Sequence, residues 1–324
     1  MNWINIFASA LFALVSLGPA QSFAQDYPTR TISLIVPATP GTTGDQLARL
    51  LGPKLSSAWS VPVVVDNKVG AGGAIGIEAG AKAAPDGYTF LFSATAFSSL
   101  PALREKLPYD PVKSFTHVVL LAKSPLVLVV PNQSPARTVK EFVDYVKKQP
   151  AGSLNYASPG IGSVHHLTME LFKQQTGLQI THIPYKGTSG ALNDLVAGHV
   201  QASVVVLQTA LPLLQGGKMR LLAVMGPERM PQFPEVPTLG EAGVPKVVSE
   251  AWYGVTAPAG TPAAVVAKMN AAINRLLQQP EVKNALEGVG VNPIGGTPEQ
   301  MNTLVQNEIR TWAQVVKVGN IQGE

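Results

Sequence analysis

The alternation of short β-branched runs with amphipathic stretches is the sequence feature that most constrains this fold. Residues 31–36 and 61–66 are dense in Val and Ile, and turns rich in Gly, Pro or Thr follow them. Residues 44–55, between these runs, carry leucines three and four positions apart, which is helical spacing. Strand-like and helix-like segments keep alternating along the chain, and this pattern predicts an α/β protein.

The expected strands cover residues 31–36, 61–66, 88–92, 117–122, 126–130, 154–157, 180–184, 200–206, 220–224 and 251–257. The expected helices cover residues 44–55, 70–84, 138–148 and 162–175, and further helices begin near residues 187, 262 and 298. We expect Pro53 to kink or split the first helix. Thr138 with Glu141 predicts a capping box, while Thr261 and Thr297, each followed by proline, predict helix N-caps.

Two βαβ series and a late return of the chain predict two doubly wound lobes with a ligand cleft between them. The length of 324 residues also favours about two domains. We expect residues 25–123 plus 250–324 to form lobe 1 and residues 124–249 to form lobe 2. In folds of this kind, ligands bind beyond the carboxyl ends of the strands, where Gly-rich turns lead into helices.

The N-terminus has the pattern of an export signal. Residues 6–17 are almost wholly apolar, and residues 22–24 place small side chains where a signal peptidase cleaves, so cleavage is predicted after Ala24. The apolar stretch is shorter than the roughly 20 residues of a transmembrane helix. Residues 1–5 contain no Lys or Arg, which leaves a buried N-terminal helix as the alternative. The signal predicts a protein that is exported from the cytoplasm.

Composition excludes several classes of function. The chain has no cysteine, so disulfides, thiolate catalysis and cysteine–metal sites are excluded. The net charge is +4, from 24 basic and 20 acidic residues spread along the chain. So small and dispersed an excess does not indicate nucleic-acid binding.

No motif predicts catalysis, a cofactor or a metal. The chain lacks the Gly-x-Ser-x-Gly elbow, the His-Glu-x-x-His pair and the phosphate-binding Gly-Lys-Ser/Thr. Ser163 and His166 have no evident acid to orient the histidine, and His166 with Glu170 is too small a set for a metal site. Gly70-x-Gly72 lacks the third glycine of a dinucleotide-binding turn, because Ile75 stands there. We therefore expect a protein that is not an enzyme.

Three loops could each bind an anion. They are residues 36–45, 70–76 and 158–163, and each follows a strand and leads into a helix. Small residues leave backbone N–H groups free, and the helix dipole favours a negative group there. The alternative is that these are plain turns, in which Asp45 and Ser163 only satisfy helix ends.

With these loops the chain resembles the tripartite tricarboxylate transporter substrate-binding proteins, also called Bug or TctC-like receptors. The resemblance covers nearly the whole chain after residue 25. Its motifs are Tyr27-Pro28, Ile35-Val36-Pro37, Gly70-Ala71-Gly72-Gly73, Ala84-Pro85-Asp86-Gly87, Leu107-Pro108-Tyr109-Asp110-Pro111, His166-Leu167, Pro184-Tyr185-Lys186-Gly187, Glu235-Val236-Pro237-Thr238 and Ala257-Pro258-Ala259-Gly260. The resemblance implies a two-lobed, type II periplasmic binding protein that closes on a small organic carboxylate.

The resemblance also implies a set of ligand-binding residues. In that family two loops face each other across the cleft and hold a carboxylate by backbone N–H groups, hydroxyls and bridging waters, with little use of arginine. The positions that match here are Thr39, Gly41, Thr42 and Thr43 in the first loop, Ser158, Gly160, Gly162, Ser163 and His166 in the opposite lobe, and Ser93 and Thr95 after the third strand.

The sequence departs from the family pattern at three places. Ala38 replaces a frequent aromatic residue, and Thr42 and Thr43 replace glycines. Val205 stands where many members have an aspartate that would pair with a ligand ammonium or hydroxyl group. We therefore include Val205 in the expected site and expect a carboxylate with a less polar body than an amino acid.

The resemblance implies a receptor that captures a carboxylate by lobe closure and delivers it to the membrane permease subunits of a tripartite transporter. We expect a monomer, because a closing cleft needs no second copy. A ligand-binding sensor component of a signalling system and a nucleotide-dependent Rossmann-type enzyme are the alternatives. The identity of the carboxylate stays open.

Overall fold

The computed structural model describes residues 27–288 and 290–323, so the expected export signal at residues 1–24 lies outside the described residues. The strands are β1 (Ile32–Val36), β2 (Val63–Asn67), β3 (Thr89–Ala94), β4 (Phe115–Pro131), β5 (Asn155–Ser158), β6 (Thr181–Pro184), β7 (Ala202–Val206), β8 (Met219–Val224), β9 (Glu250–Pro258) and β10 (Asn292–Pro293). The helices are α1 (Thr43–Trp59), the 3₁₀ turn η1 (Ala71–Gly73), α2 (Ala74–Ala81), α3 (Ala96–Leu103), α4 (Val139–Lys147), α5 (Val164–Thr176), α6 (Thr188–Ala197), α7 (Leu207–Gln215), α8 (Ala263–Leu277), α9 (Pro280–Gly288) and α10 (Pro298–Gly319). The predicted α/β class is confirmed.

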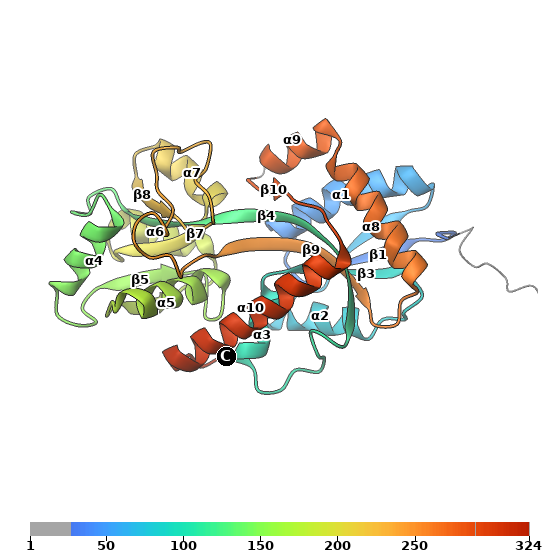
Figure 1. Cartoon of the computed structure of the whole chain (residues 1–324), viewed down its shortest axis with the longest axis horizontal. Coiled ribbons are helices and arrows are strands. Elements are labelled where there is room, and N and C mark those ends of the chain that lie inside the picture. Colours follow the sequence, from blue (N-terminus) through green and yellow to red (C-terminus); the bar gives the residue numbers. More distant parts are fainter. Residues whose placement is uncertain (1–26, 289, 324) are drawn as a thin grey trace, which may run out of the picture.

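The strands form two lobes that share β4. The order along the sheet is β2-β1-β3-β9-β4-β7-β5-β6, with β8 and β10 also paired to β4. The first part of β4 pairs with β9 as far as Pro125, and from Leu126 onward it pairs with β7 and β8. Figure 1 shows β4 and β9 running side by side across the middle of the molecule, between the two groups of helices.

Alternation along the strands fills a core on each face of both lobes. In β1, Leu34 packs with α1, α8 and α9, whereas Ile35 packs on the other face with α2, α3 and α10. In the second part of β4, Leu128 packs with α4 and α5, and Val127 packs with α6 and α7. Strands buried on both faces read as continuous apolar runs, as in a doubly wound fold.

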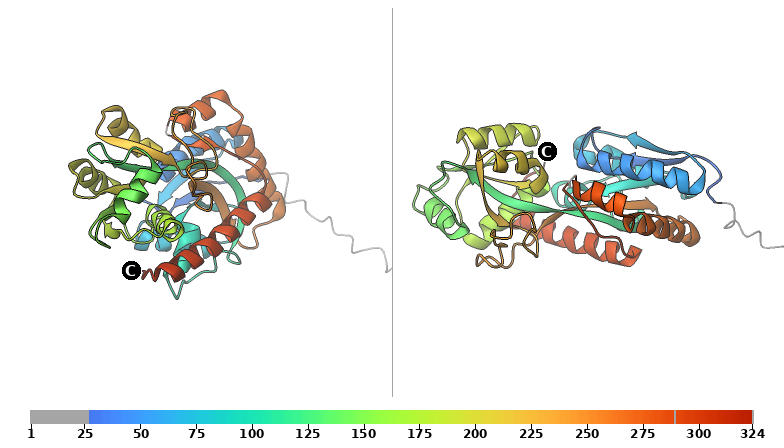
Figure 2. Two further views of the ribbon diagram at one scale, coloured as in Figure 1. Left: turned by 60° about the vertical axis from the view of Figure 1, so that its left-hand side comes forward. Right: turned by 90° about the horizontal axis from the view of Figure 1, so that it is seen from above.

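Helix α10 crosses from one lobe to the other. Its first half buries Met301 and Val305 in the first lobe, while Trp312 and Val315 are buried in the second lobe with Phe172 of α5. Figure 2 shows α10, in red, running along both lobes. The C-terminal helix is therefore shared, and the sequence pattern had assigned all of residues 250–324 to lobe 1.

Several expected elements differ from the structure. Residues 117–122 and 126–130, which were expected as two strands, form one strand, because the residues between them pair with β9 as far as Pro125 and Glu250. Pro53 lies inside a continuous α1, whose Leu47 and Leu51 are fully buried. Helices α3 and α7 have no side-chain cap to mark their starts, and they were not expected from the sequence.

Helix caps follow the sequence at two of three places. Thr297 is the expected N-cap of α10 and also forms a capping box with Gln300. Thr138 caps α4 by accepting from the Glu141 backbone, but the Glu141 carboxylate accepts from the Arg137 N–H, so the capping box expected there is only half formed. Thr261 does not cap α8; its hydroxyl donates to the Pro258 carbonyl, and the helix begins one residue later than expected. Within the part of the chain that the structure describes, none of the helices has the length and apolar character that a membrane crossing requires.

The pKa of Glu308 generates a prediction about stability. This α10 carboxylate accepts hydrogen bonds from Ser98 (2.5 Å) and the Trp252 indole (2.6 Å). Burial raises its pKa, although these hydrogen bonds oppose the shift. Because the folded state holds its proton to higher pH than the unfolded state, the stability present at acid pH is lost as the pH rises through the raised pKa.

We expect Glu308→Gln to remove the loss of folding stability at rising pH, because an amide carries no charge and still accepts a hydrogen bond. The Tm of the variant relative to the parent should be higher at pH 7.5 than at pH 4.5, as measured by thermal unfolding at both pH values. If the Tm difference between the variant and the parent does not change with pH, the Glu308 carboxyl group does not have a raised pKa in the folded state.

Candidate functional site

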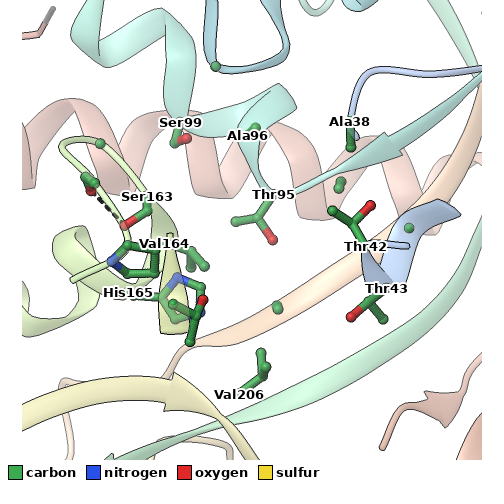
Figure 3. A pocket seen from close by; sticks show the side chains of 18 of the residues that line it. Ala38, Thr42, Thr43, Thr95, Ala96, Ser99, Ser163, Val164, His165 and Val206 are labelled. Atoms are coloured by element: carbon green, nitrogen blue, oxygen red, sulfur yellow. Dashed lines mark hydrogen bonds between the residues drawn. The ribbon is translucent and has the colours of Figure 1, made fainter. Parts of the chain in front are cut away.

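A cavity of about 910 Å³ lies between the two lobes, at the carboxyl ends of the strands (Figure 3). The first lobe lines it with the loop before α1 and with the start of α3. The second lobe lines it with residues 159–165, with Tyr185, Lys186 and Thr188, and with the start of α7. The cavity is therefore at the place where a doubly wound fold binds its ligands.

Five helices begin at this cavity. Their first residues or N-caps line it, and these are Thr42, Thr43 and Gly44 of α1, Thr95 and Ala96 of α3, Ser163, Val164 and His165 of α5, Thr188 of α6, and Val206, Gln208 and Thr209 of α7. The first N–H groups of a helix have no partner within it, and the helix dipole adds positive potential there. The cavity wall thus offers backbone donors from several directions.

Side-chain charges reinforce this polarity. Among the described residues that line the cavity there is no Asp or Glu, and Lys186 is the single Lys or Arg. Lys186 is held beside residues 158–159, because the N–H of Tyr185 donates to Ser158 O (2.9 Å) and that of Gly187 donates to Pro159 O (3.1 Å). An anion in the cavity therefore meets no like charge from the lining side chains.

The acidic residue in the first turn of α1 does not line the cavity. Asp45 in the first turn of α1 is buried and accepts hydrogen bonds from the Gly41 N–H (2.9 Å), the Arg49 guanidinium (3.0 Å) and the Asn67 amide (2.9 Å). Burial would raise the pKa of this carboxyl, but the three hydrogen bonds outweigh it and hold the pKa below its usual value. Asp45 therefore shapes the first loop and does not contact the cavity.

The loop before α5 is fixed by its own side chains. Ser163 caps the helix by accepting from the His166 N–H (3.2 Å), and its hydroxyl donates to Gly160 O (2.8 Å). Gly162 has φ +74°, and a Cβ there would lie 2.2 Å from Cδ1 of Leu103 in the first lobe. Glycine at this position therefore lets the two lobes approach each other.

A stacked pair of histidines supports this loop from behind. The rings of His166 and His182 lie 3.8 Å apart and nearly parallel, and His182 also stacks on Tyr156. His166 Nδ1 accepts from the Gly162 N–H (3.0 Å), and His182 Nε2 lies 2.7 Å from the Ser158 hydroxyl. Burial lowers the pKa of His166 to about 4 and that of His182 to about 3, so both rings are neutral at neutral pH.

The structure brings seven of the twelve expected site residues to the cavity. They are Gly41, Thr42, Thr43, Thr95, Gly160, Gly162 and Ser163. The other five do not line it. Thr39 is exposed on the loop, Ser93 is buried in β3, and Ser158 and His166 lie behind the α5 loop.

Val205, which was expected in the site, does not line the cavity. Its side chain is fully buried in the core of the second lobe with Val127 and Leu195, and the neighbouring Val206 reaches the cavity instead. Side chains alternate along a strand, so a shift of one residue exchanges core for cavity. The identity of residue 205 therefore does not bear directly on the ligand.

Several lining residues were missed by the sequence analysis. Lys186 lies in a motif of the family resemblance, and His165 is next to the expected site residue His166, but neither was predicted to line the site. Gln208 and Thr209 follow a strand that was correctly expected, so the strand-to-helix rule used for the other loops could have found them. No three His, Asp or Glu side chains of the described residues are grouped so that they could hold a metal ion.

Comparison with known proteins gives one consistent family. The model of the tripartite tricarboxylate transporter family receptor, TctC, matches residues 47–321. Protein BugT of Bordetella pertussis is 36% identical over 323 residues, which cover 98% of each chain.

Solved structures agree in fold. The structure "R. palustris Rpa4515 with adipate" has a TM-score of 0.81 and 36% identity, covering 92% of this chain and 100% of its own. MatC from Rhodopseudomonas palustris with bound malate has a TM-score of 0.77 and 36% identity, covering 90% of this chain and 100% of its own. The family resemblance and the two-lobed periplasmic binding protein fold expected from the sequence are confirmed.

Two glycines at opposite ends of α5 make a matched test of lobe contact. Gly162 and Gly177 both have positive φ, but a Cβ at Gly177 would meet nothing within 4 Å. Both Gly→Ala changes should therefore cost about 1 kcal/mol or more of backbone strain. Gly162→Ala should cost roughly 1–3 kcal/mol beyond that, from the clash with Leu103.

Urea unfolding of the two variants would measure this difference in the free energy of unfolding. Equal losses would mean that the contact between Gly162 and Leu103 does not constrain the lobes.

Proposed function

The chain belongs to the tripartite tricarboxylate transporter receptor family, and we propose that it is a periplasmic solute-binding protein for a small organic carboxylate. The observation that carries this proposal is the meeting of five helix N-termini around a cavity whose described lining has no acidic side chain. The adipate and malate bound by two structural neighbours support the same ligand class.

Backbone donors can supply the necessary affinity. A micromolar complex needs about 8 kcal/mol. The dipole of one helix contributes only about 0.3–2 kcal/mol, so the dipoles alone are too weak. Hydrogen bonds to a charged group contribute about 1.5–3 kcal/mol each, and four to six of them would offset the cost of ordering the ligand and closing the lobes.

We propose that closure moves residues 27–123, together with the chain from residue 250 to the first half of α10, against residues 124–249. The strands β4 and β9 join these units and would bend where β4 changes partners, near Pro125 and Leu126. Because α10 packs on both lobes, its second half must slide on α5 or move with the second lobe. Closure takes the carboxylate out of water, which strengthens every hydrogen bond to it.

In this proposal the liganded, closed monomer docks on the permease subunits of a tripartite transporter and performs no chemistry on its ligand. The hydroxyl of Ser163 supports this, because the capping and loop hydrogen bonds already occupy it. Export by residues 1–24 would place the protein in the periplasm.

A thermal-shift screen tests the ligand class. The chain without residues 1–24 would be mixed with mono-, di- and tricarboxylates, amino acids and aromatic acids, and with nucleotides as the contrasting set. A ligand at a hundredfold excess over its Kd stabilises the fold by about 2.7 kcal/mol, which is a shift of a few degrees for a chain of this size. We expect shifts from carboxylates alone; a shift from nucleotides alone would overturn the proposal.

Lys186 gives a second test. We expect Lys186→Gln to weaken binding of the best carboxylate of that screen about two- to fivefold, because the charge is exposed and partly screened by water. The matched control is Lys246→Gln, which removes an exposed charge that does not line the cavity. Calorimetry at about 0.05 and about 0.5 M salt should show that Lys186→Gln loses less affinity at the higher salt concentration, where the charge is screened. Equal affinities for both variants at low salt would remove Lys186 from the site.

A further inference from the structure

His165 lies in the cavity wall and is not used by the proposed anion cradle. It is the second residue of α5, directly after Val164, and its ring faces the region between the α5 loop and Val206 (Figure 3). The cradle needs only the backbone N–H groups at this helix start, so the imidazole side chain requires a separate explanation.

Neither ring nitrogen of His165 has a hydrogen-bond partner among the described residues, and both are closed off from solvent. The adjacent His166 differs, because its Nδ1 accepts from Gly162 and its ring stacks on His182. A buried polar group without a partner is costly, so native proteins rarely keep one without a role. Two unpaired nitrogens at the edge of a ligand cavity therefore point to a ligand.

A ring flip can bring one nitrogen of His165 to the cavity side without a change in the outline of the ring. A half-turn about the Cβ–Cγ bond exchanges Nδ1 with Cδ2 and Nε2 with Cε1 inside the same ring outline. The ring edge that faces the cavity can therefore present a nitrogen to a ligand.

The chemistry of a neutral imidazole limits what that ligand is. Burial lowers the pKa of His165 to about 4, so at neutral pH one ring nitrogen donates a hydrogen bond and the other accepts one. A carboxylate can only accept, so it satisfies the donor nitrogen and leaves the other unpaired. The acceptor nitrogen needs an N–H or O–H group on the ligand.

No charged acceptor of the described lining competes with His165 for a ligand hydroxyl. The described lining contains no carboxylate. The Tyr185 hydroxyl already donates to Asp194. Neutral oxygens and the His165 nitrogen are therefore the acceptors that remain.

We propose that His165 contacts the ligand and selects a hydroxycarboxylate over the same acid without its hydroxyl group. This inference rests on the proposed carboxylate-binding function and adds a specificity-determining residue to it. A site built to hydrogen-bond a hydroxyl discriminates strongly against an analogue that lacks it, because the site's own polar group is then left unpaired.

The test compares matched acid pairs by calorimetry on the chain without residues 1–24. The pairs are malate with succinate and 3-hydroxybutyrate with butyrate. His165→Phe keeps a flat ring and removes both nitrogens, whereas His165→Gln keeps one donor and one acceptor. His199→Phe is the control, because His199 is exposed and does not line the cavity. Thermal unfolding establishes that each variant is folded.

We expect the parent and His199→Phe to bind the hydroxy acid of at least one pair about tenfold or more tightly than its partner. His165→Phe should bring that ratio to within about twofold, and His165→Gln should keep part of it. Acids that bind the parent without preference for the hydroxyl, or a preference that survives His165→Phe, would overturn this inference alone. If no carboxylate of the screen binds, the proposed function falls and this inference falls with it.

Discussion

The site depends on unpaired backbone N–H groups, which the fold brings together from five strand-to-helix turns. Each turn is short, and each helix starts at the carboxyl end of a strand, so its first donors point into the space between the lobes. No side-chain charge of the second lobe other than Lys186 lines that space. The wall is therefore positive in character while it carries little net charge, and lobe closure does not have to bury many ionised groups.

This arrangement constrains the residues around it. An acid at the start of α1 would repel an anion, and Asp45 avoids this by turning back onto Gly41, Arg49 and Asn67. In the second lobe a neutral pair, His166 and His182, fixes the loop before α5. Both supports use buried hydrogen bonds, so the donors are held in place before any ligand arrives. Preorganisation of this kind lowers the cost of binding.

The joints between the lobes follow from the same topology. Strand β4 belongs to both lobes, and its alternating side chains fill four cores, two in each lobe. The chain returns from the second lobe to the first through β9, which pairs with β3 and with β4. Two paired strands therefore connect the lobes. Helix α10 then covers both lobes. In the closure proposed above, these three elements are the joints that would bend or slide.

The sequence by itself determined the fold class, most strands, the loops that start α1 and α5, and the Thr297 cap, because these depend on local periodicity and local hydrogen bonds. It did not determine that β4 is continuous, because pairing with β9 keeps residues 123–125, between the two expected strands, extended. It also placed two site residues one position away, choosing His166 and Val205 where His165 and Val206 line the cavity. Only the tertiary structure decides which of two neighbouring residues faces the cleft, because this depends on what packs against the other side of the strand or helix.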